Sequence, residues 1–515
     1  MSAAAADTDG ESQHQIELRP LPNGWCWSAI GAAAAPIRNA IVDGPFGSNL
    51  KLSDYADDGT VPVLTTKNID GHFDGVRYVT EQKFEELRRS AVVPHDILMA
   101  KIGSCGKVGI YPADAPTALI PANLLKMTVN RLFHLHYVYY YFNSVTFQRH
   151  LKTIIKATAQ PAFGVTNFKR LPLPVAPAKE QVRIVSKIEE LFSEIEEGER
   201  ALERVQKLVE RYRQSVLKAA VTGELTREWR EKHKGPLESG EALLQRILKA
   251  RREAWERAAP VKMTGKAQSP AISADTTNLP DLPSGWVWAS MDQVGLVSGG
   301  LTKNQKRGEH ALQRPYLRVA NVYTNRLELG DVQEIGVSES ELDRVLLQTD
   351  DLLVVEGNGS IDQIGRVALW DGSIPDCVHQ NHIIKVRSCG LLPSWYLLVW
   401  CMSPLGREQI RRVASSTAGL HTLSISKVQA LPVPVPPAAE LSIIKDAFER
   451  MDSRVHAQRV AISAENKRAG ALRQAVLRQA FVGALVSQDP TDEPASTLLA
   501  HISTEPPPTP VRRRS

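Results

Sequence analysis

The feature that most restricts the fold of this chain is an internal repeat. Residues 213–226 read RQSVLKAAVTGELT and residues 473–486 read RQAVLRQAFVGALV, so the same helix end occurs twice, 260 residues apart (473 − 213). LPNGWCWSAIG at 21–31 likewise returns as LPSGWVWASMD at 282–292. Further pairs keep the same order, with offsets between 253 (316 − 63) and 261 (282 − 21). A period this long indicates two similar domains, each followed by the same kind of helix, and not a solenoid.

A proline-rich segment precedes a long helical pattern in both copies. RLPLPVAPAKEQVRIV at 170–185 matches ALPVPVPPAAELSII at 430–444, and prolines end a domain before a helix begins. Between 180 and 218 apolar residues recur at steps of three, four and seven, which predicts a heptad seam. These residues are Ile184, Ile188, Leu191, Ile195, Leu202, Val205, Val209, Tyr212 and Val216. The second copy has Phe448, Met451, Val455, Ile462, Ala469, Leu472 and Val476, with Glu465 in place of Val205.

The two long helices are each expected to need a partner, because a narrow apolar seam on a charged helix cannot bury itself. Each predicted helix, 180–218 and 440–478, would be roughly 58 Å long at 1.5 Å per residue. An antiparallel pair with one domain at each end is the economical arrangement, since a parallel pair would require 219–281 to retrace that distance. The sequence therefore predicts an α+β fold. Two similar globular α/β domains alternate with two long helices that pair as an antiparallel coiled coil, with approximate twofold symmetry.

Composition places the chain among ordinary proteins that act in water. Hydrophobic residues make up 43% and charged residues 23% of the 515 residues, and the net charge is +5. The five cysteines form no CxxC pair, which favours reduced thiols in a cytoplasmic protein. The first residues contain acids and no secretory apolar core, and the most apolar run, WYLLVWCM at 395–402, is too short to span a bilayer. We expect no membrane partner.

Motifs for catalysis are absent from the sequence. The string GSCGKVG at 103–109 has the wrong spacing for a phosphate-binding loop and lacks the Ser or Thr after Lys107. There is no HExxH, no convincing zinc cluster and no Asn/Asp-Pro-Pro-aromatic tetrapeptide of an adenine methyltransferase. The Pro-Asp pairs at 280–281 and 375–376 lack the acidic-x-Lys that follows in nucleases. The sequence predicts a chain with no catalytic residues and no metal site.

Two divergent globular domains alternating with two similar long helices resemble the specificity subunit of type I restriction–modification enzymes. The resemblance covers about residues 20–487. It rests on Leu-Pro-x-Gly-Trp-x-Trp at the start of each half, on AKEQVRIVSKI at 178–188 and on LKAAVTGELTREWR at 217–230. DGPFGSNLK at 43–51 also looks like a common opening of such recognition domains. The second copy of the helix start is weaker, because Leu441 stands in place of the usual Gln.

The resemblance implies a division of labour among subunits. Each globular domain would read one half of a split, asymmetric target on double-stranded DNA, and the helical pair would set the gap between the half-sites. The helices would also dock two methyltransferase subunits, giving adenine methylation, or ATP-dependent restriction when endonuclease subunits join. S-adenosylmethionine would belong to the methyltransferase subunit, and ATP and magnesium to the endonuclease subunit, so this chain would hold no cofactor.

The expected segmentation follows from the repeat and the resemblance together. A short amphipathic helix is expected around Leu243, Ile247 and Trp255. The segments are a disordered N-terminus at 1–20, target-recognition domain one at 21–177, the family's central long helix at 178–225, the short helix and linker at 226–281, target-recognition domain two at 282–437, the C-terminal long helix at 438–487 and a disordered tail at 488–515.

Candidate DNA contacts are polar and basic residues in loops, because such side chains contact phosphates and base edges. Domain one has 16 Lys and Arg against 11 Asp and Glu, whereas domain two has 14 against 15, so total charge locates no DNA face there. Asn68 and Asn321 occupy matching repeat positions, which favours a shared turn. The candidates are Ser48, Asn49, Lys51, Lys67, Asn68, Lys101, Ser104, Lys107, Gln160, Lys303, Asn304, Gln305, Lys306, Arg307, Arg318, Asn321, Asn358, Arg366 and His421.

Two other interpretations stay open at this point. One is a self-contained methyltransferase or nuclease with its own recognition domain, which the missing catalytic motifs argue against. The other is a two-domain scaffold that never touches DNA, which explains the repeat equally well and the modest charge better. A steep fall of DNA affinity with salt would separate a DNA-binding subunit from a scaffold.

Overall fold

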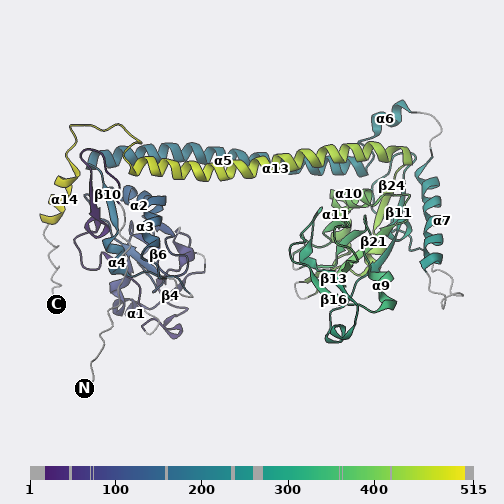
Figure 1. The fold of residues 1–515 in the computed structure, drawn as a ribbon, viewed down its shortest axis with the longest axis horizontal. Coiled ribbons are helices and arrows are strands. Elements are labelled where there is room, and N and C mark those ends of the chain that lie inside the picture. Colours follow the sequence, from purple (N-terminus) through teal and green to yellow (C-terminus); the bar gives the residue numbers. More distant parts are fainter. Residues whose placement is uncertain are drawn as a thin grey trace, which may run out of the picture. The chain divides into compact units, whose positions relative to one another are not determined.

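The chain divides into two compact units in a computed structural model. Unit 1 comprises residues 1–202 and 463–515, and unit 2 comprises residues 203–462. Figure 1 shows the elements of both units. The structure describes residues 18–45, 49–69, 71–73, 75–156, 160–233, 238–258, 271–358, 360–361, 363–417 and 420–504.

Unit 1 is built on two four-stranded sheets and one strand pair. The first sheet has the order β2 (Ile41–Asp43), β9 (Leu124–Met127), β6 (Ile97–Ala100) and β7 (Val108–Ile110), all antiparallel neighbours. The second has the order β4 (Arg77–Val79), β3 (Val61–Val63), β8 (Ala118–Leu119) and β5 (Ala91–Val92). Helices α2 (Leu135–Asn143), α3 (Val145–Lys152) and α4 (Val165–Arg170) pack their buried side chains with those of the first sheet.

Unit 2 repeats this plan. Its four-stranded antiparallel sheet has the order β12 (Gly295–Gly299), β21 (Ile383–Ser388), β17 (Leu352–Val355) and β19 (Val367–Leu369). A three-stranded sheet has the order β16 (Gln333–Gly336), β13 (Gln313–Leu317) and β20 (Val378–His379). Helices α10 (Ser394–Met402), α11 (Pro404–Val413) and α12 (Ile425–Gln429) correspond to α2, α3 and α4. The predicted pair of similar α/β domains is therefore present.

The long helices α5 (Ala178–Val221) and α13 (Ala438–Phe481) have 44 residues each and lie side by side within each unit (Figure 1). In unit 1 the early part of α5 packs with the late part of α13, where Arg473 donates to both carboxylate oxygens of Glu199 at 2.6 and 2.9 Å. In unit 2 the late part of α5 packs with the early part of α13, where Arg459 donates to Glu210 at 3.0 Å. The pairing is antiparallel, which confirms the predicted fold class.

The tryptophan motif that opens each copy joins its domain to the start of a long helix. β1 (Cys26–Ala29) pairs with β10 (Pro172–Val175), and β11 (Val287–Ser290) pairs with β24 (Pro432–Val435), so this motif and the proline-rich segment form one antiparallel pair. Trp25 donates from Nε1 to Glu180 at 3.0 Å, and Trp286 donates in the same way to Glu440 at 3.1 Å. Both carboxylates lie in the first turn of a long helix.

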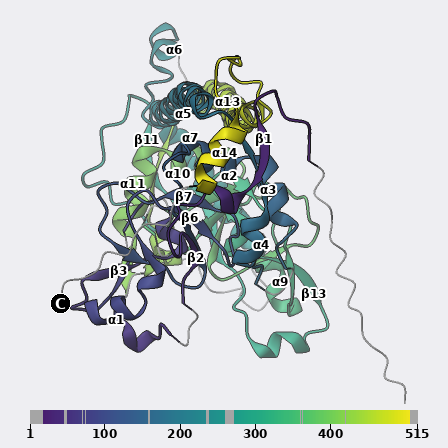
Figure 2. The ribbon, with the colours of Figure 1, turned by 90° about the vertical axis from the view of Figure 1, so that its left-hand side faces the viewer.

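The short helices that follow the long ones are also copies of each other. α7 (Gly240–Ala258) begins where Gly240 N–H donates to Gly285 O at 2.6 Å, and α14 (Ala495–Thr504) begins where Ala495 N–H donates to Gly24 O at 2.8 Å. Leu243 and Leu498 are buried at equivalent places in these two helices. Figure 2 shows α14 beside β1 in unit 1.

The disordered tail predicted for 488–515 is wrong for 488–504. Asp492 bonds Arg183 at 2.6 Å, and Leu498 joins the core of unit 1. The reason is that this segment covers the opening strand pair of unit 1, as α7 covers that of unit 2. Residues 505–515 lie outside the described residues.

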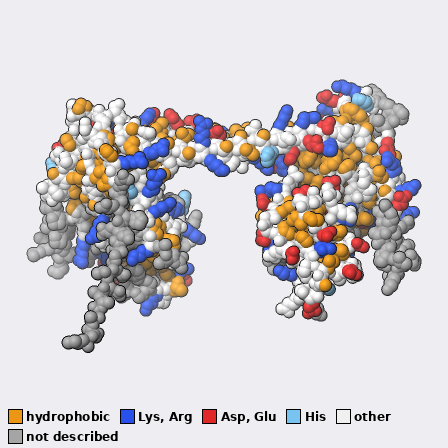
Figure 3. Space-filling view, in the orientation of Figure 1, with side chains coloured by type: hydrophobic (Ala, Val, Ile, Leu, Met, Phe, Trp, Pro, Cys, Tyr) orange, Lys and Arg blue, Asp and Glu red, His pale blue; other side chains and the backbone are white. Residues whose placement is uncertain are grey.

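The predicted heptad seam is buried only in part. Ile184 and Ile188 of α5 are fully buried, but Val205 and Tyr212 are 38% and 42% exposed. A straight helix drifts by about 20° per heptad relative to a strict seven-residue repeat, so a long stripe leaves the contact line. Leu472 is exposed on α13 for the same reason. Figure 3 shows apolar, basic and acidic side chains mixed along the exposed faces of both helices.

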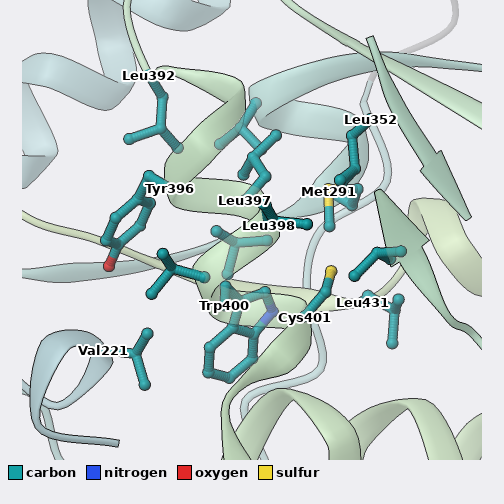
Figure 4. Close-up of a cluster of buried hydrophobic side chains, with 14 of the residues drawn as sticks. Val221, Met291, Leu352, Leu392, Tyr396, Leu397, Leu398, Trp400, Cys401 and Leu431 are labelled. Atoms are coloured by element: carbon teal, nitrogen blue, oxygen red, sulfur yellow. The ribbon is translucent and has the colours of Figure 1, made fainter. Parts of the chain in front are cut away.

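The core of each unit joins its recognition domain to its part of the helical pair. In unit 2, Figure 4 shows Leu397, Leu398 and Trp400 of α10 gathered with Leu352 of β17 and Val221 at the end of α5. In both units a buried tyrosine ties this layer to the proline-rich strand. Tyr137 donates to Pro174 O, and Tyr396 donates to Pro434 O, each at 2.9 Å. Burial raises the pKa of both phenols well above the usual value, so they remain hydrogen-bond donors.

Candidate nucleic-acid interface

Several candidate loops of unit 1 leave from one end of the sheet β2-β9-β6-β7. Strands β2 and β6 end there, and β7 and β9 begin there, because the strands are antiparallel neighbours. The loops at this end carry Asn49, Lys51, Ser104 and Lys107, whose side chains are exposed. The segment with Gln160 joins them, since Gly103 N–H donates to Pro161 O at 3.0 Å. Ser104, Lys107 and Gln160 therefore lie in neighbouring segments at this end of the sheet, while Asn49 and Lys51 lie in the segment that follows β2.

The equivalent end of the sheet in unit 2 carries different side chains. β12 and β17 end there, and β19 and β21 begin there. Exposed Lys303, Asn304 and Gln305 follow β12, while Arg366 precedes β19. β18 (Gly357–Asn358) pairs with β23 (Leu420–Thr422), and Asn358 and His421 are backbone partners in this pair. β23 also pairs with β22 (Ser415–Thr417). The same plan thus presents two different sets of polar groups.

The two matching asparagines hold turns and have no group left for a base. Asn68 accepts from Thr65 N–H at 2.8 Å and donates to His72 O at 2.7 Å. Asn321 accepts from Arg318 N–H at 2.8 Å and donates to Glu328 O at 2.8 Å. Both are only 3% exposed. Their place among the DNA-contact candidates is wrong, because buried amides must satisfy backbone groups, as the shared-turn prediction required.

Several candidate cations are paired with carboxylates of their own unit. Lys101 lies in the loop directly after β6, as predicted, but it is only 7% exposed and forms a buried ion pair with Asp43 at 2.5 Å. Arg307 donates to both oxygens of Glu341, at 3.2 and 3.1 Å, and it holds the pKa of that carboxyl at about 2. Arg318 bonds Asp331 at 2.7 Å. These pairs position the loops and reduce the charge available to phosphates.

Arg366 takes a different role, because its guanidinium lies 5.0 Å from the centre of the Tyr323 ring. It also donates to Val319 O at 3.3 Å, which holds η7 (Val319–Asn321) beside the start of β19. Lys67 is exposed on the corresponding element of unit 1, η3 (Thr66–Asn68). Ser48 lies outside the described residues, as do the side chains of Lys306, Asn358 and His421.

Basic residues at the end of α11 were missed by the sequence analysis. Arg411 and Arg412 are exposed in the last turn, immediately before β22 of the loop end. In unit 1 the equivalent α3 ends with exposed Arg149 and Lys152, before the segment that carries Gln160. The signal that could have found them is two cations at matching repeat positions, Lys152 and Arg411, 259 residues apart (411 − 152).

A family model described as "Type I restriction modification DNA specificity domain" matches residues 46–204, which include most of the loop end of unit 1 and the first part of α5. The chain is 22% identical over 505 residues to the EcoKI specificity subunit of Escherichia coli strain K12, covering 94% of this chain and 96% of that protein. The chain is therefore similar over nearly its whole length to type I restriction–modification specificity subunits. It is also 22% identical over 500 residues to the StySPI specificity subunit of Salmonella potsdam, with the same coverage.

The chain shares its fold with a protein of solved structure. A chain described under "Structural basis underlying complex assembly and conformational transition of the type I R-M system" superposes with a TM-score of 0.58 at 15% identity, over 91% of this chain and all of that one. Over the part of the chain that the structure describes, no helix is long and apolar enough to cross a membrane. The same residues contain no group of three or more His, Cys, Asp and Glu side chains that could bind a metal ion.

Proposed function

We propose that this chain is a specificity subunit that addresses a type I restriction–modification complex to double-stranded DNA, with each unit binding one half of a split target. The observation that carries this proposal is the duplicated loop end, where one sheet plan presents two different sets of polar side chains. Exposed Asn49, Lys51, Ser104, Lys107 and Gln160 would serve one half-site. Exposed Lys303, Asn304 and Gln305 would serve the other, with Arg366 supporting η7. Because these sets differ, the target is not a palindrome.

The helical pair would dock two methyltransferase subunits and set the spacer between the half-sites. Support comes from an apolar surface on unit 2, where Val205, Leu208 and Tyr212 are 38%, 58% and 42% exposed. They line a groove of about 590 Å³ together with Val455 and Ala457 of α13. A surface of this kind on a water-exposed helix is typical of a protein-docking site.

Catalysis in this proposal belongs to the partner subunits, which act in the cytoplasm. The methyltransferase subunits would bring S-adenosylmethionine, and endonuclease subunits would bring ATP and magnesium. The specificity subunit itself would be non-catalytic and would bind no cofactor. No described side chain therefore needs a reactive role, and the perturbed groups of the fold are explained by burial and ion pairing.

The test is to reconstitute the full chain with its methyltransferase subunit and to identify the modified sites by methylome sequencing. The expected result is an asymmetric two-part motif with a fixed gap, and no methylation by the chain alone. Replacing residues 21–177 with the recognition domain of a relative should change one half of the motif. Inserting one heptad into both α5 and α13 should lengthen the gap and leave both halves unchanged.

Two outcomes would contradict the proposal. Methylation by the isolated chain would show that it is an enzyme. Binding to duplex DNA that does not weaken with salt, or no binding in the presence of the methyltransferase subunit, would favour a scaffold, because phosphate contacts release counterions.

A further inference from the structure

One face of α5 in unit 2 carries three exposed cations. Lys207, Arg211 and Lys218 are exposed, and at 100° per residue they fall within about 40° of one another. They line a groove of about 560 Å³ with Gln214, Ser215 and Pro404, the first residue of α11. Among the described residues none of the three cations has an ion-pair partner. The one acid of the groove, Glu210, is paired with Arg213 and Arg459 at 3.1 and 3.0 Å.

This basic face is separate from the apolar docking surface on the same helix. The stripe of Val205, Leu208 and Tyr212 is centred about 110° around α5 from the cations at 3.6 residues per turn. The apolar stripe lies beside α13, because residues of α13 line its groove. The cations lie instead beside α11, which belongs to the recognition domain. The two faces therefore suit two different partners.

Helix α11 continues the basic face toward the recognition loops. Pro404 lies in the groove, and exposed Arg411 is seven residues later, on the same face two turns on. The chain then enters β22, which belongs to the loop end described above. Basic side chains thus lead from the long helix to the surface that carries the candidate base contacts.

Part of this arrangement recurs in unit 1, although Ala471 stands at the position that matches Arg211. Lys467 and Arg478 of α13 are exposed and stand 260 residues after Lys207 and Lys218 (467 − 207 and 478 − 218). Gln474, the counterpart of Gln214, donates to Asn143 O at 3.3 Å, directly before α3. Exposed Lys152, the last residue of α3, occupies the position that matches Arg411 in α11. A shared core explains matching apolar residues, but it does not explain matching exposed cations.

We propose that these cations form a phosphate-binding track in each unit, which grips the duplex backbone next to the half-site without reading its sequence. The unit 2 track is Lys207, Arg211, Lys218 and Arg411, and the unit 1 track is Lys467, Arg478 and Lys152. The inference rests on the proposed function and adds a second DNA contact, on the long helices. Duplex DNA is the fitting occupant because the track is basic, carries no apolar anchor and ends at the recognition loops.

The test neutralises the unit 2 track with Lys207→Gln, Arg211→Gln and Lys218→Gln in the full chain, assembled with methyltransferase subunits. Affinity for the complex's own target is measured between 50 and 200 mM salt. Because each phosphate contact contributes about 0.9 to the slope of log affinity against log salt, losing one contact should make the decrease in affinity over this range about 3.5-fold smaller. Losing three contacts should make it about 40-fold smaller. The base preference should stay the same. The matched control is Lys232→Gln, Lys249→Gln and Arg252→Gln, three exposed cations on α6 (Arg227–Lys232) and α7.

A second arm removes the charge from the DNA instead. Methylphosphonates placed only beside the half-site that unit 2 binds should weaken wild-type binding and leave the triple variant almost unaffected. An unchanged salt slope, or a slope reduced equally in the control, would overturn the track. Loss of methyltransferase subunits from the variant would overturn it as well, since the cations would then bind an acidic protein face. Failure of the wild-type complex to bind DNA would instead overturn the proposed function.

Discussion

The buried carboxylate at the start of α13 offers a sharp test of how each recognition domain is fixed to its helix. Glu440 is fully buried, and its Oε2 accepts hydrogen bonds from Trp286 at 3.1 Å, Thr226 at 2.5 Å and Arg230 at 2.6 Å. We expect Glu440→Gln to destabilise unit 2 by about 3–5 kcal/mol, the usual cost of removing one partner of a buried ion pair. At 1.4 kcal/mol per factor of ten, this raises the open population of unit 2 by roughly 100- to 4,000-fold.

The matched variant in unit 1 is Glu180→Gln. Glu180 accepts from Trp25 at 3.0 Å and from Gln488 at 3.4 Å, and no cation among the described residues is seen to donate to it. Burial raises the pKa of Glu180, and the hydrogen bond from the Trp25 N–H only partly opposes this effect. Ionisation of the carboxyl therefore lowers the stability of unit 1 once the pH rises above the usual pKa of a glutamate. A neutral amide removes that cost, and we expect a change of about 1 kcal/mol or less at neutral pH.

The assay is hydrogen exchange read by mass spectrometry, which reports the opening of β11 and β24 separately from β1 and β10. Trp286→Phe serves as an intermediate case, because it removes one donor and keeps an aromatic side chain, at a cost of about 1 kcal/mol for the lost hydrogen bond. If Glu440→Gln opens unit 2 no more than Glu180→Gln opens unit 1, the cluster around Glu440 does not hold the domain as argued.

Three further predictions follow from ion pairs and burial. Ending the chain after residue 487 removes Asp492 and Leu498, so unit 1 should lose about 2–4 kcal/mol while unit 2 keeps its hydrogen-exchange protection. The pKa of Glu341 is about 2, below its ordinary value of 4.5, so the ionised carboxylate stabilises unit 2 fully above pH 4.5. This stability should fall as the pH drops from 4.5 toward 2, and Arg307→Gln should flatten that dependence in acid unfolding curves. Burial lowers the pKa of Lys385 to about 8, so unit 2 should gain stability from pH 8 to 10.5 in urea unfolding, and Lys385→Met should abolish the gain.

Features that repeat along the chain could be predicted from the sequence. The two helices expected at 180–218 and 440–478 are present at Ala178–Val221 and Ala438–Phe481, because proline boundaries and heptad spacing are local signals. Their antiparallel pairing followed from the connection length. The loop end could be predicted only as a set of polar segments, because strand order depends on contacts between residues far apart in the chain.

The errors have physical causes that local patterns do not contain. Lys101 and Arg307 looked like surface cations, but their carboxylate partners are 58 and 34 residues away. The folded tail was hidden by its polar composition, although Leu498, Leu499 and Ile502 repeat Leu243, Leu244 and Ile247, 255 residues later (498 − 243). A search for repeats beyond the long helices would have found α14.

Unit 1 is formed by two separate stretches of the chain, residues 1–202 and 463–515, and this imposes an order on folding during synthesis. Its core needs Leu477, Phe481 and Leu498, which leave the ribosome after the whole of unit 2. At about 5–20 residues per second, the 260 residues from 203 to 462 take roughly 13–52 s to synthesise. During that interval the first recognition domain waits with an uncovered apolar face, while the second, contiguous one can already close. A nascent chain stalled before residue 463 is therefore the form most exposed to chaperones and proteases.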